Sequence, residues 1–230
     1  MQNNFLTQFD EIMLSSKTIS KIPIFENQVK QKITTTTEKK KFVKKREDIF
    51  CLKENDQLFW YFFIFFYGME EYETISNYFL KEKEVKFNFV EKIRNNKQLC
   101  KQLKISRNVV EDELVNQKKI SLKSLKLLCY LFDINVFYIE NKKYYEMIPN
   151  ENNKIFVIEK IEKDNVIKYV SKESIEYYRL HYWKMENLDK PLKAVSSYKV
   201  DELKSICKKL SIPFDKETKQ ELYQKILTII

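Results

Sequence analysis

The sequence predicts an α+β fold in which helices come first and a small antiparallel sheet follows. Apolar residues recur at helical spacing from residue 57 to residue 132, and the spacing changes to alternation from residue 134. Helical spacing then returns in the last part of the chain, which predicts a two-helix module at the C-terminal end. Helical and alternating patterns in separate blocks are typical of α+β proteins.

The composition excludes several classes of protein. The hydrophobic share of 43% and the aromatic share of 14% exclude an intrinsically disordered chain. The 230 residues include one Gly and no GxGxxG, GxxxxGK[ST] or GxSxG pattern, which excludes Rossmann, P-loop and α/β-hydrolase sites. The single His excludes an HExxH zinc site. We therefore expect no metal and no cofactor.

Residues 1–46 are predicted to form an amphipathic helix followed by a basic linker. Residues 5–14 place apolar side chains on one helical face. These side chains belong to Phe5, Leu6, Phe9, Ile12 and Met13. The following stretch to Lys45 contains Pro23 and a run of four threonines, which favours an extended linker. The apolar face of the helix is expected to pack on the rest of the chain or to bind a partner protein.

Positive charge is concentrated in two segments. The chain has 42 Lys and Arg against 33 Asp and Glu, a formal net charge of +9. Residues 30–46 hold eight basic residues and one acid, and residues 190–230 hold nine lysines and five acids. Local basic segments favour a polyanionic partner. For residues 30–46, a solvated linker without a partner is the alternative.

A central α+β domain is expected over residues 47–189. The aromatic run after Asp56 predicts a buried helix over residues 57–67, N-capped by Asp56 and ended by Gly68. This run is too short for a membrane span, which needs about 20 apolar residues, so we expect no membrane association. Further helical patterns cover residues 70–81, 87–95, 98–103 and 121–132.

The alternating part of the central domain predicts two strand pairs and a closing helix. The first pair is a β-hairpin of residues 134–139 and 144–147. The second pair covers residues 154–160 and 165–170. Residues 174–185 are rich in aromatic side chains and are predicted to be helical.

The C-terminal module, residues 190–230, has the most specific pattern in the chain. One helical face carries Val200, Leu203, Ile206, Cys207 and Leu210. A Pro-containing break follows, and Lys219 begins a second helix in which Leu222 and Ile226 face the first. The segments Val200–Lys204, Lys208–Pro213 and Lys219–Ile226 resemble the SAP and Rho N-terminal family of helix–extended loop–helix modules. Two family glycines are missing, since Ser211 replaces one and none precedes Lys219.

The resemblance implies binding to duplex DNA, or to RNA in the Rho-like branch, mainly through backbone phosphates. Little readout of base sequence is expected. The residues expected to contact phosphates are Lys199, Lys204, Lys208, Lys219 and Lys225 of the module and Lys39, Lys40, Lys41, Lys44, Lys45 and Arg46 of the linker. A protein-docking or packing role, with solvated lysines, is the alternative for the module.

Two further segments are similar to uncharacterised proteins of nucleocytoplasmic giant DNA viruses. They are the aromatic run Asp56–Ile64 and the junction Lys190–Lys199. This similarity implies a virion or a virus factory in the host cytoplasm, and the N-terminal sequence has no secretory pattern. The leading expectation is a non-enzymatic viral protein that associates with nucleic acid. The rival is a virion structural or scaffold protein.

The order of elements loosely resembles papain-like and OTU-like cysteine peptidases, so a degenerate member of such a fold is a further alternative. The expected nucleophile position holds no Cys, and Cys51 or Cys129 with His181 are the remaining dyads. Carboxylate clusters at 70–73 and 111–113 are better explained as solvated helix faces than as a nuclease centre. The sequence therefore predicts no catalytic residue.

Overall fold

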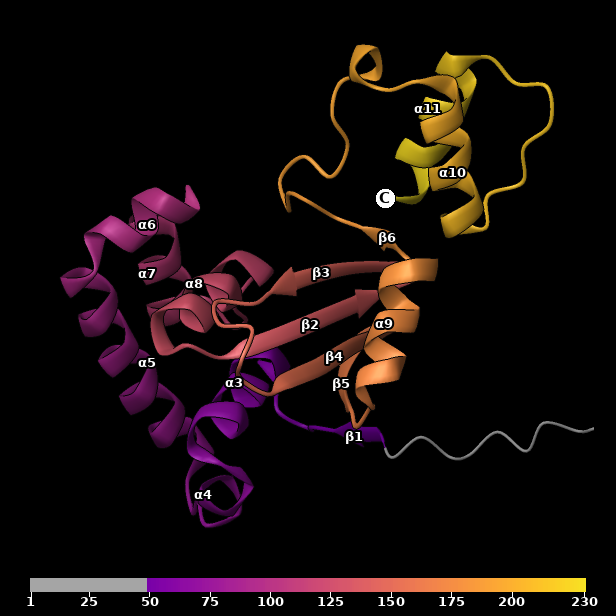
Figure 1. The fold of residues 1–230 in the computed structure, drawn as a ribbon. Helices are drawn as coiled ribbons and strands as arrows, with labels where there is room; N and C mark the ends of the chain where they lie inside the picture. The colour runs from indigo at the N-terminus through magenta and orange to yellow at the C-terminus, as the bar shows by residue number, and fades with distance from the viewer. Residues whose placement is uncertain (1–48) are drawn as a thin grey trace, which may run out of the picture. The chain divides into compact units, whose positions relative to one another are not determined.

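The computed structural model describes residues 49–230, which belong to one unit spanning Lys44–Ile230. The predicted helix over 5–14 and the basic linker lie outside the described residues. Within residues 49–230, nine α-helices and a six-stranded sheet confirm the α+β class (Figure 1). The elements in chain order are β1 (Ile49–Cys51), α3 (Gln57–Tyr67), α4 (Met69–Glu73), α5 (Tyr78–Asn95), α6 (Lys97–Leu103), α7 (Arg107–Val115), α8 (Leu122–Phe132), β2 (Asn135–Glu140), β3 (Lys143–Met147), β4 (Ile155–Ile161), β5 (Asp164–Lys168), α9 (Lys172–His181), β6 (Trp183–Lys184), η1 (Val195–Ser197), α10 (Val200–Leu210) and α11 (Lys219–Ile229).

Helix α3 is buried and has the predicted bounds. The Asp56 side chain accepts a hydrogen bond from the backbone N–H of Phe59, and the helix ends at Gly68, whose φ is 98°. Five consecutive residues, Phe59–Phe63, have no exposed surface. Burial of the Tyr61 hydroxyl requires a partner, and this hydroxyl donates to the Asn165 carbonyl at 2.6 Å. The aromatic run is therefore the centre of the core, as predicted.

The predicted single helix over 70–81 is wrong. Helix α4 ends at Glu73, and α5 begins at Tyr78 and continues without a break to Asn95. The Asn77 side chain accepts a hydrogen bond from the N–H of Leu80 and so starts the second helix. The apolar spacing is continuous across the break, which is why periodicity alone missed it.

The sheet is mixed, so the prediction of a purely antiparallel sheet is wrong. Its strand order is β1-β5-β4-β2-β3-β6, with β2 parallel to β4 and β3 parallel to β6. The two predicted strand pairs are present as antiparallel neighbours, β2 with β3 and β4 with β5. Asn141 and Lys142 in the first hairpin have φ values of 44° and 51°, the left-handed conformation that a two-residue type I′ turn requires.

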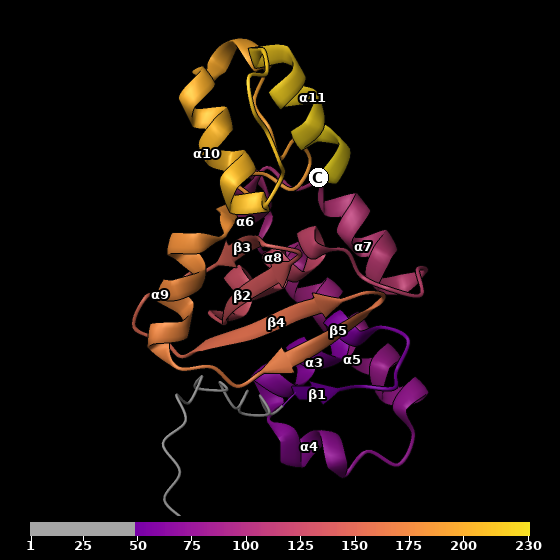
Figure 2. The same cartoon turned by 90° about the vertical axis from the view of Figure 1, so that its right-hand side faces the viewer.

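Both faces of the sheet are covered. Along β2, Val136 and Tyr138 belong to the main core with α3, whereas Phe137 and Ile139 belong to a second cluster with α9. This alternation follows from the two-residue period of a strand. Figure 2 shows α9 and the helical layer on opposite faces of the strands. The predicted helix over 174–185 begins and ends earlier, because Ser171 caps α9 and Trp183 enters strand β6.

Candidate nucleic-acid interface

The C-terminal module contains the two predicted helices, α10 and α11. Glu202 accepts a hydrogen bond from the Lys199 backbone N–H at 2.7 Å and thereby caps α10. In α11, Thr218 and Glu221 cap each other's backbone N–H groups at 3.4 and 2.8 Å. The side chains that bury the facing surfaces of the pair are Leu203, Ile206, Cys207, Leu210, Leu222 and Ile226.

The loop between α10 and α11 tolerates the missing glycine. Ser211 adopts a left-handed conformation with φ of 56°, and the N–H of Ile212 donates to the Cys207 carbonyl at 2.8 Å. This is the hydrogen bond of a Schellman motif, in which Gly is the usual residue. Ile212 is buried behind the turn. Ser211 therefore occupies the glycine position with strain of about 1–2 kcal/mol.

Four of the five module lysines lack an ion pair among residues 49–230. Lys199 and Lys208 are exposed, and Lys204 and Lys219 are half-exposed. Lys225, the fifth, is exposed but pairs with Glu217 and donates to the Pro213 carbonyl at 3.3 Å. The expected phosphate contact of Lys225 therefore competes with an ion pair that the sequence did not indicate. The six basic residues of the linker lie outside the described part of the chain.

The helix N-termini of the module are already occupied by carboxylates. Glu202 and Glu221 accept backbone N–H groups there, and the bonds from Thr218 lower the pKa of Glu221. A phosphate at either N-terminus would face a fixed negative charge beside the helix donors. We therefore expect any contact of the module with phosphate to be made mainly by lysine side chains.

Lys142 of the β2–β3 turn and Lys143, the first residue of β3, contact the module. Lys142 donates to the Ser211 hydroxyl, and the buried ammonium group of Lys143 lies 3.4 Å from the Ile230 carbonyl oxygen. These residues are 69 and 87 positions from their partners in the sequence. No sequence signal marked them, because nothing local distinguishes them from the other lysines of the chain.

The cysteines and the histidine considered for a peptidase dyad do not pair with each other in the described chain. Cys129 is fully buried, and burial raises the pKa of its thiol. Cys51 is exposed, and its Sγ lies 3.6 Å from the Leu52 carbonyl oxygen. The His181 ring stacks on Tyr177 with centroids 4.1 Å apart. In the described chain, His181 is a partner of neither cysteine.

The carboxylates of the 111–113 cluster stabilise helices. Glu111 forms ion pairs with Arg94 and Arg107 at 2.9 and 3.1 Å. Glu113 accepts from the Ser121 N–H and the Ser124 hydroxyl at the start of α8. Over residues 49–230, no group of three or more His, Cys, Asp or Glu side chains is arranged to hold a metal ion.

Comparisons of the chain with models of known protein families, with curated proteins and with solved structures found no match. None of the helices between residues 49 and 230 is both long and apolar enough to span a bilayer.

Proposed function

We propose that this protein associates with nucleic acid without enzymatic activity and binds the backbone phosphates of duplex DNA through its C-terminal module. The observation that carries this proposal is the set of four lysines, Lys199, Lys204, Lys208 and Lys219, on two well-capped helices without ion-pair partners in the described chain. Lysines that are not neutralised by neighbouring acids are available to replace the counterions of DNA. The basic linker would add contacts of the same kind.

The proposed setting is a virus factory in the host cytoplasm or a virion. It rests on the similarity of the aromatic run and the 190–199 junction to giant-virus proteins. There, phosphate binding would serve genome packaging, transcription or factory organisation.

A fluorescence-anisotropy titration with duplex DNA of about 20 base pairs, over a salt series, tests the proposal. The variant carries Gln at Lys199, Lys204, Lys208 and Lys219. The control carries Gln at four exposed lysines outside the module: Lys53, Lys92, Lys163 and Lys172. Because each lost phosphate contact reduces the slope of log K against log salt by about 0.9, the module variant should lose about 3.6 from the slope.

The control variant has the same net charge and should keep more of the slope and the affinity. Equal losses in both variants would show a non-specific effect of net charge and would contradict a role for the module. Absence of binding by the unmodified protein at low salt would contradict nucleic-acid association altogether.

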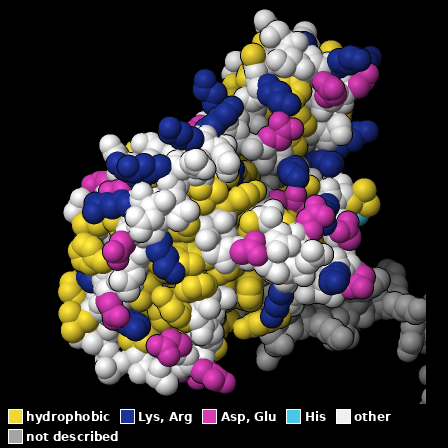
Figure 3. Space-filling model, turned by 60° about the vertical axis from the view of Figure 1, so that its left-hand side comes forward, with side chains coloured by type: hydrophobic (Ala, Val, Ile, Leu, Met, Phe, Trp, Pro, Cys, Tyr) yellow, Lys and Arg dark blue, Asp and Glu magenta, His cyan; other side chains and the backbone are white. Residues whose placement is uncertain are grey.

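A scaffold role is the second candidate, because apolar side chains of helix α5 are exposed in the part of the chain that the structure describes. Phe79, Leu80 and Phe87 are 68%, 62% and 55% exposed, and Figure 3 shows hydrophobic side chains at the surface on this side of the molecule. Exposed apolar groups of this size favour contact with a protein. Replacing the three residues by Ser should abolish that contact without changing the DNA titration.

A further inference from the structure

Helices α6 and α7 are joined by a turn of three residues, Lys104-Ile105-Ser106. Lys104 adopts the left-handed conformation with φ of 55°, and the Ile105 N–H donates to the Cys100 carbonyl at 3.0 Å. Ser106 then precedes the first residue of α7. Two helices linked by a three- or four-residue turn with a left-handed residue are the local geometry of a helix-turn-helix unit.

The second helix of this unit is held firmly on one side. Val110 and Leu114 of α7 are fully buried, and Cys100 of α6 is 5% exposed. Helix α5 packs against α6 and α7, and α8 packs against both as well. A helix that reads DNA must keep a fixed orientation relative to the duplex, and this packing supplies the fixed orientation.

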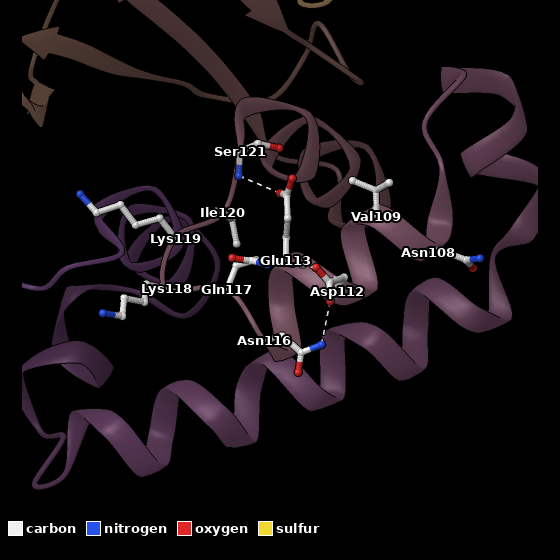
Figure 4. Close-up of a pocket in the computed structure, with 10 residues that line it drawn as sticks. All are labelled: Asn108, Val109, Asp112, Glu113, Asn116, Gln117, Lys118, Lys119, Ile120 and Ser121. Atoms are coloured by element: carbon white, nitrogen blue, oxygen red, sulfur yellow. Dashed lines mark hydrogen bonds between the residues drawn. The ribbon is translucent and has the colours of Figure 1, made fainter.

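The opposite side of α7 is exposed to solvent and mostly polar. Asn108, Asp112 and Asn116 are exposed at spacings of four residues, with Val109 beside them at 51% exposure. They line a shallow hollow together with the loop that follows α7 (Figure 4). Asn side chains recognise the N6 and N7 atoms of adenine, and a carboxylate accepts from the N4 amino group of cytosine. The exposed stripe of α7 therefore consists of side chains that can read base edges.

Of the three acids of α7, Glu111 is compensated by ion pairs with two arginines. Glu113 accepts hydrogen bonds from neutral groups at the start of α8 and is not available to DNA. Asp112 is the remaining acid, and hydrogen bonds from the Asn116 and Gln117 amides lower its pKa. It is therefore an ionised acceptor already oriented by two donors.

Unpaired lysines flank the stripe in the sequence at both ends of α7. Lys101 and Lys104 precede the helix, and Lys118 and Lys119 follow it. All four are exposed, and none has an ion-pair partner within residues 49–230. Cations at the two ends of a polar helix can contact phosphates where the helix enters and leaves a DNA groove.

We infer that α6 and α7 form a helix-turn-helix that places α7 in the major groove of duplex DNA and reads base edges with Asn108, Asp112 and Asn116. The flanking lysines set the position of the helix by contact with phosphates. Duplex DNA is the partner because the major groove of A-form RNA is too narrow for side chains to read. This inference rests on the proposed association with nucleic acid but adds sequence-specific readout at a second site.

The test is selection of the full chain on a pool of duplex DNA with a randomised central segment, followed by anisotropy with the enriched duplex and a scrambled one. The unmodified protein should enrich a short motif and bind it at least about 10-fold more tightly than the scrambled duplex. The double variant Asn108→Ala/Asn116→Ala should lose this ratio while keeping its affinity for the scrambled duplex. A matched control is Asn88→Ala/Asn152→Ala, which removes exposed amides elsewhere.

The outcomes separate this inference from the proposed function. If the protein binds DNA with a steep salt dependence but enriches no motif, the helix-turn-helix assignment is overturned and the phosphate-binding module stands. If the module variant loses affinity but selects the same motif, both proposals are supported. Preference for duplex RNA over DNA, abolished by the same asparagine changes, would also overturn the inference. A melting curve for each variant shows that it is folded.

Discussion

The buried ion pair between Asp56 and Lys86 is expected to be the most sensitive point of the helical layer. Asp56 is 1% exposed and accepts the Lys86 ammonium at 2.6 Å and the Ile120 N–H at 3.1 Å. It also caps α3 through Phe59. One carboxylate therefore connects α3, α5 and the segment before α8. The perturbation is Asp56→Asn, which keeps the size of the side chain and one oxygen acceptor but removes the charge.

The expected loss of stability is about 3 kcal/mol. Lys86 is 2% exposed, and without Asp56 its remaining anionic partner is Glu82 at 2.7 Å. Breaking one side of a buried pair typically costs about 3–5 kcal/mol, and the retained cap and Glu82 place this case at the lower end. The more exposed Glu82, changed to Gln, should cost about 1 kcal/mol or less. Urea denaturation followed by the fluorescence of the two buried tryptophans, Trp60 and Trp183, measures both values.

A double-mutant comparison decides whether the unpaired charge is the cause. Adding Lys86→Met to Asp56→Asn removes the buried ammonium that has lost its buried carboxylate partner, so the double variant should be more stable than Asp56→Asn alone. A cost for Asp56→Asn no larger than that of Glu82→Gln would refute the reasoning. An additive further loss in the double variant would refute it as well.

Three further predictions concern single side chains. Ser211→Gly should stabilise the protein by about 0.5 kcal/mol in urea denaturation, because relief of about 1–2 kcal/mol of left-handed strain exceeds the entropic cost of glycine; a decrease would contradict this account of the turn. Burial raises the pKa of Glu146, but hydrogen bonds and charge from Lys184 and Arg179 outweigh burial and hold it below the usual 4.5. The ion pairs of Glu146 therefore contribute stability that is fully present above about pH 4.5 and is lost as the pH falls through the lower pKa of the folded state. The free energy of unfolding of Glu146→Gln should depend less on pH over this acidic range than that of the unmodified protein. With a thiol reagent, Cys51 should react in the native state while Cys129 reacts only on unfolding. Equal reaction rates of Cys51 and Cys129 in the native protein would contradict the burial of Cys129.

The elements predicted correctly are those that local signals specify. Asp56 and Ser121 accept N–H groups three residues further along, so the starts of α3 and α8 are visible in the sequence. The β2–β3 hairpin has β-branched and aromatic residues on both sides of a two-residue turn. In each of these cases, the interacting groups are close together in the chain.

The predictions that failed depend on more distant relations or on competing local signals. The parallel pairing of β2 with β4 joins strands that are not adjacent in the sequence, so alternation could not reveal a mixed sheet. In the stretch 70–81, the cap at Asn77 competed with an unbroken apolar period, and the cap prevailed.

The candidate interface also has features that local sequence patterns predict and features that depend on how the helices pack. The sequence predicted the helices of the C-terminal module, because helical period can be counted along the chain, whereas the phosphate contacts of its lysines stay a prediction. The pairing of Lys225 with Glu217 and the exposed stripe on α7 depended on how the helices fold and pack.

By itself, the sequence determined the α+β class, the aromatic core helix, the hairpins and the two helices of the module. Only the tertiary structure decided that Asp56 meets Lys86, 30 residues away, and Ile120, 64 residues away. The physical reason is the range of the interactions. A cap or a tight turn is satisfied within a few residues, whereas burial of a charge depends on which distant elements pack around it.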